Sequence, residues 1–215
     1  MEYLKTIEWL KERLQQPLPG ADAHARMMAR VREMPAQIPQ DARASAVLSV
    51  LFPVADELNL LFIKRTEDGH AHSGQISFPG GRMDPTDADL RATALREAQE
   101  EVGIMSEEVS ILGELTPLYI PVSNFQVHPF VAFAQHRPQY HINKSEVDFI
   151  IEIPLKEILS EEIKTVTKVT SPADPTFVRN VNAYQLPESK IIWGATAMIL
   201  SELEVILEEI VKKNH

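Results

Sequence analysis

The segment GGRMDPTDADLRATALREAQEEVGI, residues 80–104, carries the strongest signal in this 215-residue chain. Its acidic cluster follows Arg96 and consists of Glu97, Glu100 and Glu101. These carboxylates stand at positions i, i+3 and i+4, so one face of a helix would present all three. Like charges at this spacing weaken an isolated helix by roughly a few tenths of a kcal/mol per pair, and a bound dication removes that repulsion. The segment therefore predicts divalent-metal chemistry on a phosphate ester or anhydride.

The same segment predicts a helix over about residues 88–102. The face opposite the carboxylates carries apolar side chains at helical spacing, namely Leu90, Ala94, Leu95, Ala98 and Val102. Asp87 or Asp89 is suited to cap the start of this helix, and Gly103 is suited to end it. One side of the helix can thus be buried while the other side carries the chemistry.

Hard cations such as Mg²⁺ and Mn²⁺ take oxygen ligands, which the three glutamates supply. The alternative is a solvated acidic helix face, the usual meaning of a run of charges. The surrounding sequence favours the metal site, because Gly80-Gly81 follows the apolar Phe78-Pro79 and Arg96 stands beside the carboxylates. A guanidinium in that position can hold a glutamate in one rotamer by charge-assisted hydrogen bonds.

The stretch from Arg96 to Ile104, REAQEEVGI, resembles the Nudix box, G-x5-E-x7-R-E-U-x-E-E-x-G-U with U aliphatic, at every fixed position. Counted from Gly81, the upstream acidic position falls on Asp87 in place of glutamate, and eight residues separate it from Arg96. An expansion of this kind resembles the coenzyme A pyrophosphatase branch of the family.

That branch has a longer signature before the box, LLTxR[SA]-x3-R-x3-G-x3-FPGG. The chain keeps its spacing and matches it at Arg65, Gly74 and residues 78–81. It departs at Phe62, Ile63, Thr66 and His70, and His70 replaces an arginine. The resemblance covers about residues 45–200, including a stretch at residues 192–197.

The resemblance implies an α/β/α sandwich with a mixed central sheet and a hydrolase that cleaves a diphosphate. It implies that Glu97, Glu100 and Glu101 hold Mg²⁺ or Mn²⁺, together with the carbonyl of Gly80. Arg96 would support these carboxylates. A carboxylate from a later loop often completes such sites in the family, and Glu146 is our candidate; the alternative is a surface residue before a strand.

Arg65 and His70 flank a short loop before the box, so we expect either of them to contact a substrate phosphate, with Gly74 in the same loop. Histidine is only partly protonated near neutral pH, whereas arginine is always charged. His70 would therefore hold a 3′-phosphate more weakly than the usual arginine does.

Composition narrows the class of protein. The length favours one domain, the chain has no cysteine, and its formal net charge is −10. Cysteine-based zinc sites and thiol nucleophiles are therefore excluded, and binding to a nucleic acid backbone is not expected. We expect a cytoplasmic enzyme with a small-molecule, nucleoside diphosphate-linked substrate.

The N-terminal stretch MEYLKTIEWLKERL has mixed charges and no uninterrupted apolar core, so we expect neither a signal peptide nor a membrane association. It reads as an amphipathic helix that packs on the body or on a second subunit. We expect residues 1–44 to form a helical arm and residues 45–215 to form the Nudix domain with its C-terminal helix. The two terminal helices could support a homodimer.

Alternation and apolar runs predict the strands between these ends. They lie at residues 46–53, 58–64, 109–115, 126–134, 149–153, 164–169 and 178–184. A short helix is expected over residues 154–159 and an amphipathic one over residues 196–213.

Three functions stay open at this point. The first is a coenzyme A or acyl-coenzyme A pyrophosphatase, which releases 3′-phospho-AMP and a 4′-phosphopantetheine product. The second is the same chemistry on ADP-ribose, a dinucleotide or a nucleoside triphosphate, which the replacement at His70 favours. The third is a binding module that has lost catalysis, against which the three retained glutamates argue.

Overall fold

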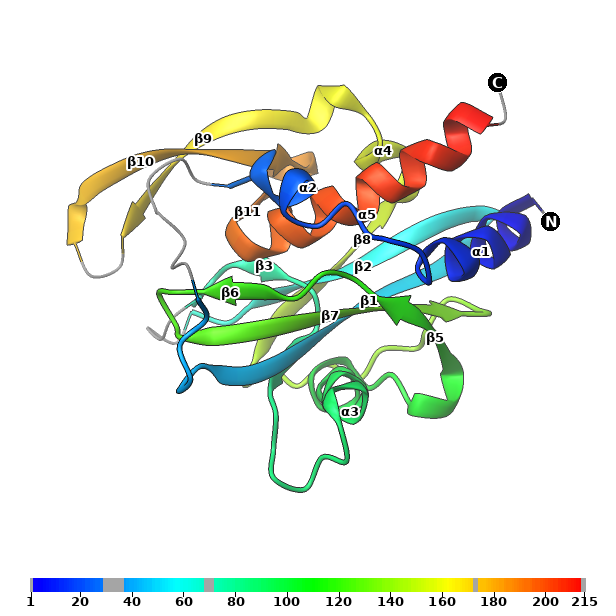
Figure 1. Ribbon diagram of the computed structural model, residues 1–215, viewed down its shortest axis with the longest axis horizontal. Coiled ribbons are helices and arrows are strands. Elements are labelled where there is room, and N and C mark those ends of the chain that lie inside the picture. Colours follow the sequence, from blue (N-terminus) through cyan, green and yellow to red (C-terminus); the bar gives the residue numbers. More distant parts are fainter. Residues whose placement is uncertain (1, 29–36, 68–71, 172–173, 214–215) are drawn as a thin grey trace.

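The computed structural model describes residues 2–28, 37–67, 72–171 and 174–213 (Figure 1). The helices are α1 (Glu2–Arg13), α2 (Ala21–Ala25), α3 (Leu90–Val102), α4 (Leu155–Ile158) and α5 (Gly194–Lys213). The strands are β1 (Arg43–Val54), β2 (Glu57–Arg65), β3 (Ile76–Ser77), β4 (Gly80–Arg82), β5 (Val109–Glu114), β6 (Leu118–Ile120), β7 (Phe125–Ala134), β8 (Val147–Pro154), β9 (Lys164–Ser171), β10 (Asp174–Gln185) and β11 (Ile191–Trp193). Short 3-10 turns cover Ser106–Glu108, Glu161–Ile163 and Pro187–Ser189.

A mixed sheet forms the centre of the molecule. Its main path runs β3-β2-β1-β7-β5, while β4 pairs with β1, β6 with β7, and β8 with β2. Strands β1 and β7 are parallel, and the other pairs of this sheet are antiparallel. The strands β11-β10-β9 form a second, antiparallel sheet. The mixed α/β fold that the sequence predicts is therefore confirmed.

Side-chain alternation along β1 builds a core on each face of the central sheet. Leu48, Val50 and Phe52 belong to the apolar cluster that contains Ala94 and Ala98 of α3. The neighbouring Leu51 points to the other cluster, which includes side chains of α1 and α5. Figure 1 shows α3 on one side of the sheet and α1, α2 and α5 on the other, with the second sheet on that same side. The acidic helix therefore lies on its own face of the sheet.

The observed helices and strands agree closely with those that the sequence predicts. Every strand and helix that it predicts is present, and α3 begins two residues later than expected. Asp89 is the N-cap, because its carboxylate accepts from the backbone N–H of Ala92, and Gly103 ends α3 in the left-handed conformation at φ 78°. Strands β3, β4, β6 and β11 were not expected, since two or three residues are too few to show an apolar period.

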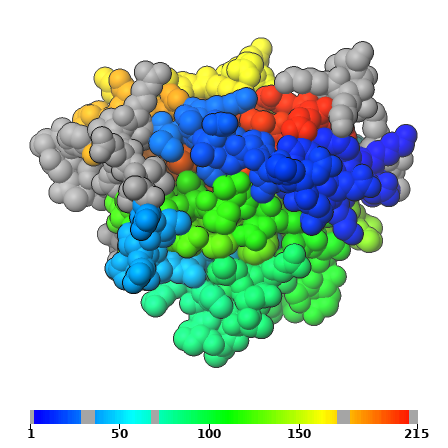
Figure 2. Space-filling view, in the orientation of Figure 1, coloured from blue at the N-terminus to red at the C-terminus, as the bar shows by residue number. Residues whose placement is uncertain are grey.

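The N-terminal residues lie against the C-terminal helix, as Figure 2 shows in blue and red. Helix α1 packs on α5 and β5, and α2 packs on α5. The buried carboxylate of Glu202 in α5 accepts the backbone N–H of Gly20 at 2.8 Å, the Thr116 hydroxyl at 2.6 Å and the Thr116 N–H at 3.0 Å. It also lies 3.1 Å from the ring of His24. The Glu202 carboxylate thus connects the N-terminal segment to the body of the molecule. The predicted domain boundary at residue 44 and the predicted homodimer remain predictions.

None of the helices within the described ranges combines the length and the apolar character that crossing a bilayer requires.

Candidate active site

The three glutamates of α3 differ in their exposure to solvent. Glu101 is 1% exposed, Glu97 is half-buried, and Glu100 is exposed. Ala94 and Ala98 lie next to Glu101 around the helix, not opposite the glutamates as the sequence suggested, and both are fully buried against the sheet. This packing fixes the helix, so the carboxylates project from a rigid support.

The carboxylate of Glu101 is held at both oxygens. One oxygen lies 3.0 Å from Nη1 of Arg65 at the end of β2, and the other accepts the backbone N–H of Gly80 at 2.8 Å. Burial raises the pKa of Glu101 to about 7, although Arg65 and the Gly80 N–H oppose that rise. Each oxygen keeps a second lone pair for a further partner.

The carboxylate of Glu97 lies directly on Gly81. A Cβ atom at Gly81 would come within 2.5 Å of the Glu97 carboxyl carbon and both of its oxygens. Arg96 donates to Glu97 at 2.9 Å, yet burial raises the Glu97 pKa above its usual range. Because Gly81 has no side chain, the Glu97 carboxylate can occupy the space beside it.

Arg96 connects the helix to the loop before it. Its guanidinium donates to both oxygens of Asp87 at 2.9 Å, to Glu100 at 2.9 Å and to the carbonyl of Arg82 at 3.0 Å. Arg96 holds the pKa of Asp87 well below its usual range. The sequence offered Asp87 as a helix cap or a box position, and the structure adds its bidentate pairing with Arg96, which fixes the loop of residues 82–89 against α3.

Of the remaining predicted residues, the structure describes Glu146 and Gly74. Glu146 is exposed, and its negative charge contributes, after burial and Arg96 or Arg65, to the raised pKa values of Glu97 and Glu101. Gly74 has φ +66°, and its N–H donates to the carbonyl of Thr66 at 3.1 Å. His70 lies outside the described residues.

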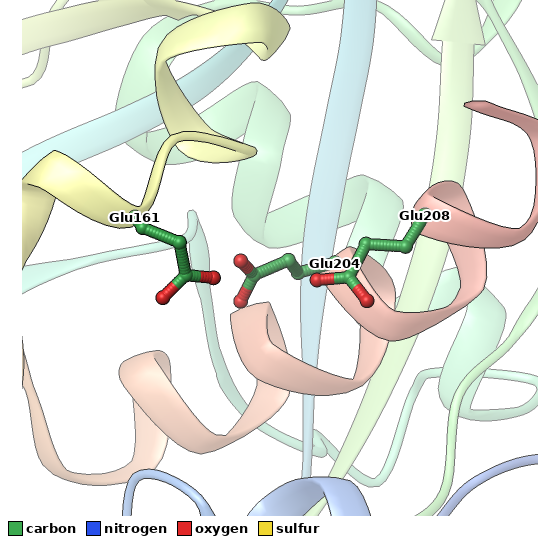
Figure 3. A group of neighbouring side chains, drawn as sticks. All are labelled: Glu161, Glu204 and Glu208. Carbon is green, nitrogen blue, oxygen red and sulfur yellow. The ribbon is translucent and has the colours of Figure 1, made fainter. Parts of the chain in front are cut away.

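A second acidic group lies on the other side of the molecule. Among the described residues, the group of three whose carboxylate oxygens all lie within 4.8 Å of one another is Glu161, Glu204 and Glu208 (Figure 3). The ammonium of Lys164 lies 2.6 Å from Glu204 and 2.5 Å from Glu161, and the Tyr184 hydroxyl donates to Glu204 at 2.7 Å. Arg26 lies 4.0 Å from Glu208, so each of the three glutamates has a cationic neighbour and the group forms an ion-pair network.

The glutamates of α3 do not converge to that distance. Arg96 donates through one nitrogen to both Glu97 and Glu100, and Arg65 pairs with Glu101. Glu97 and Glu100 thus share one arginine, whereas Glu101 has a different one.

Comparison with known proteins decides the family. The family model described as NUDIX domain matches residues 42–174, which is more than half of the chain. The chain belongs to the Nudix family. It is 38% identical over 157 residues to the Nudix hydrolase NudL of Yersinia enterocolitica, covering 72% of this chain and 78% of that protein. It is 36% identical over 188 residues to NudL of Cronobacter sakazakii, covering 86% and 94%.

The crystal structure of a MutT/nudix family protein from Enterococcus faecalis resembles the fold with a TM-score of 0.51. It is 14% identical and covers 82% of this chain and 66% of that chain, so the likeness is one of fold alone. Together with the family match, the two NudL proteins show that the chain is a Nudix hydrolase acting on phosphoric anhydrides.

Nudix hydrolases generally need divalent metal ions, and the residues on α3 fit a hard dication. The donors are carboxylate oxygens, with the backbone of Gly80 beside Glu101. Burial disfavours the charged forms of Glu97 and Glu101, and a bound dication would favour them. The donor set suits Mg²⁺ or Mn²⁺ rather than a softer metal.

Stability should respond to Mg²⁺ in a pH-dependent manner. Because the folded-state pKa of Glu101 is raised to about 7 from 4.5, the folded protein binds more protons in this window, and its stability falls as the pH rises through it. A dication binds the ionised form, so the Mg²⁺-induced increase in Tm should be small near about pH 5.5 and largest near about pH 8. Thermal unfolding of the wild type and Glu101→Gln with and without Mg²⁺ tests this. Equal increases at both pH values in the wild type would contradict it.

Proposed function

We propose that this Nudix hydrolase cleaves the diphosphate of coenzyme A or acyl-coenzyme A to 3′-phospho-AMP and 4′-phosphopantetheine or its acyl form. The observation that carries the reaction is the placement of Glu97 and Glu101 against Gly81 and Gly80, beside the charge of Glu146. The choice of coenzyme A rests on the signature before the box, with Arg65, Gly74 and residues 78–81 at its spacing.

In this proposal, Glu97, Glu100, Glu101 and the Gly80 carbonyl hold Mg²⁺ or Mn²⁺, and Glu146 completes the site. When bound, the dication stabilises the negative charge that develops on the phosphate oxygens and lowers the pKa of the attacking water. The oxygen of that water bonds to one phosphorus while the bridging P–O bond breaks and the other phosphate leaves.

The chain's own groups fix the geometry of this step. Glu97 receives the proton of the attacking water or orients that water, and its position on Gly81 sets where the water can stand. Arg96 positions Glu97 and Glu100 through the hydrogen bonds described above. The lack of a side chain at Gly80 lets its backbone approach a ligand closely.

The pairing of Arg65 favours a second candidate substrate. Its guanidinium donates to Glu101 at 3.0 Å, so it supports a carboxylate in this arrangement and does not face a substrate phosphate alone. His70 stands where the signature has another arginine. Both features favour a diphosphate that lacks the 3′-phosphate, such as ADP-ribose or a dinucleotide.

The test is a comparison of substrates with Mg²⁺ or Mn²⁺ and chromatographic separation of the products. The panel is coenzyme A, acetyl-coenzyme A, dephospho-coenzyme A, ADP-ribose and NADH. Our proposal predicts a higher kcat/KM for coenzyme A than for dephospho-coenzyme A, with 3′-phospho-AMP as a product. A preference for the substrates without the 3′-phosphate would establish the second candidate, and cleavage of none would support a binding module.

A further inference from the structure

The loop that carries Glu146 is bonded to the end of the catalytic helix. The N–H of Asn143 donates to the backbone carbonyl of Glu101 at 3.0 Å, and the N–H of His141 donates to that of Val102 at 2.9 Å. Gly103 lies under the same loop, because a Cβ atom there would come within 2.7 Å of His141. The backbone of this loop is therefore fixed relative to the helix that carries the three glutamates.

The side chain of Asn143 then connects this fixed backbone to the Glu146 carboxylate. Its Oδ1 accepts the N–H of Ser145 at 3.1 Å and the Ser145 hydroxyl at 2.6 Å. Its Nδ2 donates to Oε1 of Glu146 at 3.1 Å. To bond Ser145 and Glu146 at the same time, one short side chain must carry both a hydrogen-bond acceptor and a donor. Asparagine has both, whereas aspartate and alanine do not.

The residue that follows strand β2, Thr66, holds the same loop from the other side. The N–H of Thr66 donates to the carbonyl of Glu146 at 3.0 Å, and its hydroxyl donates to the carbonyl of Ser145 at 3.1 Å. The preceding residue, Arg65, holds the carboxylate of Glu101. Arg65, the last residue of β2, and Thr66, which follows it, thus hold two acidic residues that come from different elements.

We propose that Asn143 is a positioning residue that aims the Glu146 carboxylate at the acidic face of α3, with Thr66 holding the backbone on which Glu146 stands. The inference rests on the proposed function, because it assigns Glu146 to the site that hydrolyses the diphosphate. The bonds from the loop backbone to Glu101 and Val102 keep Glu146 near the end of α3, and its charge contributes, least among the causes, to the raised pKa values of Glu97 and Glu101. A turn that merely stabilises the loop would need the bonds to Ser145 but not the bond from Nδ2 to Glu146.

Two variants of Asn143 separate these roles. Asn143→Asp keeps the acceptor for Ser145 and loses the donor to Glu146, whereas Asn143→Ala loses both. We expect each variant to lower kcat and to weaken Mn²⁺ binding, measured by calorimetric titration, by about tenfold or more. Asn180→Ala, at an exposed position in β10, is the matched control and should change neither quantity.

The double variants complete the test. In a Glu146→Gln background, Asn143→Asp should cause little further loss, because it acts through the missing carboxylate. Wild-type kcat and Mn²⁺ affinity in Asn143→Asp, at an unchanged Tm, would overturn the proposal in favour of a structural turn. A fully active Glu146→Gln enzyme would also overturn it while leaving the hydrolase assignment intact.

Failure of the proposed function would show itself differently. If the wild type cleaved no phosphoric anhydride, the calorimetric titration would still test Asn143, because it reports metal affinity without turnover. Equal Mn²⁺ affinity in the wild type and both Asn143 variants would then reject the positioning role.

Discussion

Glu97→Gln should lower kcat by about two to four orders of magnitude while the protein stays folded. Glutamine keeps the shape of the side chain on Gly81 and can still accept the hydrogen bond from Arg96 through its amide oxygen. It removes the negative charge and the proton acceptor that the proposed role of Glu97 needs. Steady-state kinetics on the substrate found in the panel, with Tm and circular dichroism as folding checks, measure the effect.

The matched control for this variant is Glu107→Gln. Glu107 is exposed in the 3-10 turn that follows α3, so the substitution makes the same chemical change outside the proposed site. It should leave kcat unchanged. Full turnover by Glu97→Gln would remove this residue from the mechanism.

Alanine at Gly81 should mainly lower activity, whereas alanine at the adjacent Gly80 should mainly lower stability. At Gly81 the new methyl group would meet the end of the flexible Glu97 side chain at 2.5 Å, which can move away. We therefore expect a change in stability within about 1 kcal/mol and a loss of kcat of about a hundredfold, because the displaced carboxylate no longer meets the reacting groups.

At Gly80 the obstacle is backbone. The Cβ atom would lie 2.3 Å from the carbonyl oxygen of Ala46 and 2.6 Å from Cα of Val47, both in β1, and Gly80 has φ +154°. Because β1 is the central strand of the sheet, Gly80→Ala should lower the free energy of unfolding by about 1–3 kcal/mol or more. Urea denaturation of both variants measures this difference.

A double variant shows whether the Gly81 effect acts through Glu97. Gly81→Ala should cost little additional activity in a Glu97→Gln background, since both changes disable the same carboxylate. Losses that multiply in the double variant, or a Gly81→Ala enzyme with wild-type kcat, would reject the steric explanation.

The sequence predicts those features of the fold that depend on residues close together in the chain. Gly103 predicts the end of α3, while its start was left between Asp87 and Asp89, of which Asp89 is the cap. The buried faces of the long strands follow from their apolar patterns, because these depend on neighbours in the chain. Strand β4 could not be found in this manner. Its sequence, Gly80-Gly81-Arg82, has no apolar period, and it is a strand only because it pairs with β1.

Contacts between distant residues account for what the sequence left open. Arg65 meets Glu101 across 36 positions, so its pairing with a carboxylate could not be read from the loop that it precedes. Glu202 and Glu204 stand in α5 where an exposed charge would be expected, yet both are buried, with partners from α2, the β5–β6 connection, β9 and β10. The Asn143-Lys144-Ser145 stretch did carry a signal, since asparagine followed two residues later by serine is typical of a side-chain-capped turn.

The most direct test of the central claim is a crystal structure of the protein with Mn²⁺, with the ion located by its anomalous scattering. We predict Mn²⁺ on the acidic face of α3, with oxygen ligands from Glu97, Glu100, Glu101 and the Gly80 carbonyl and with Glu146 completing the site. The ion should be lost from that position in Glu97→Gln. Mn²⁺ bound at Glu161, Glu204 and Glu208 with none at α3 would contradict the account.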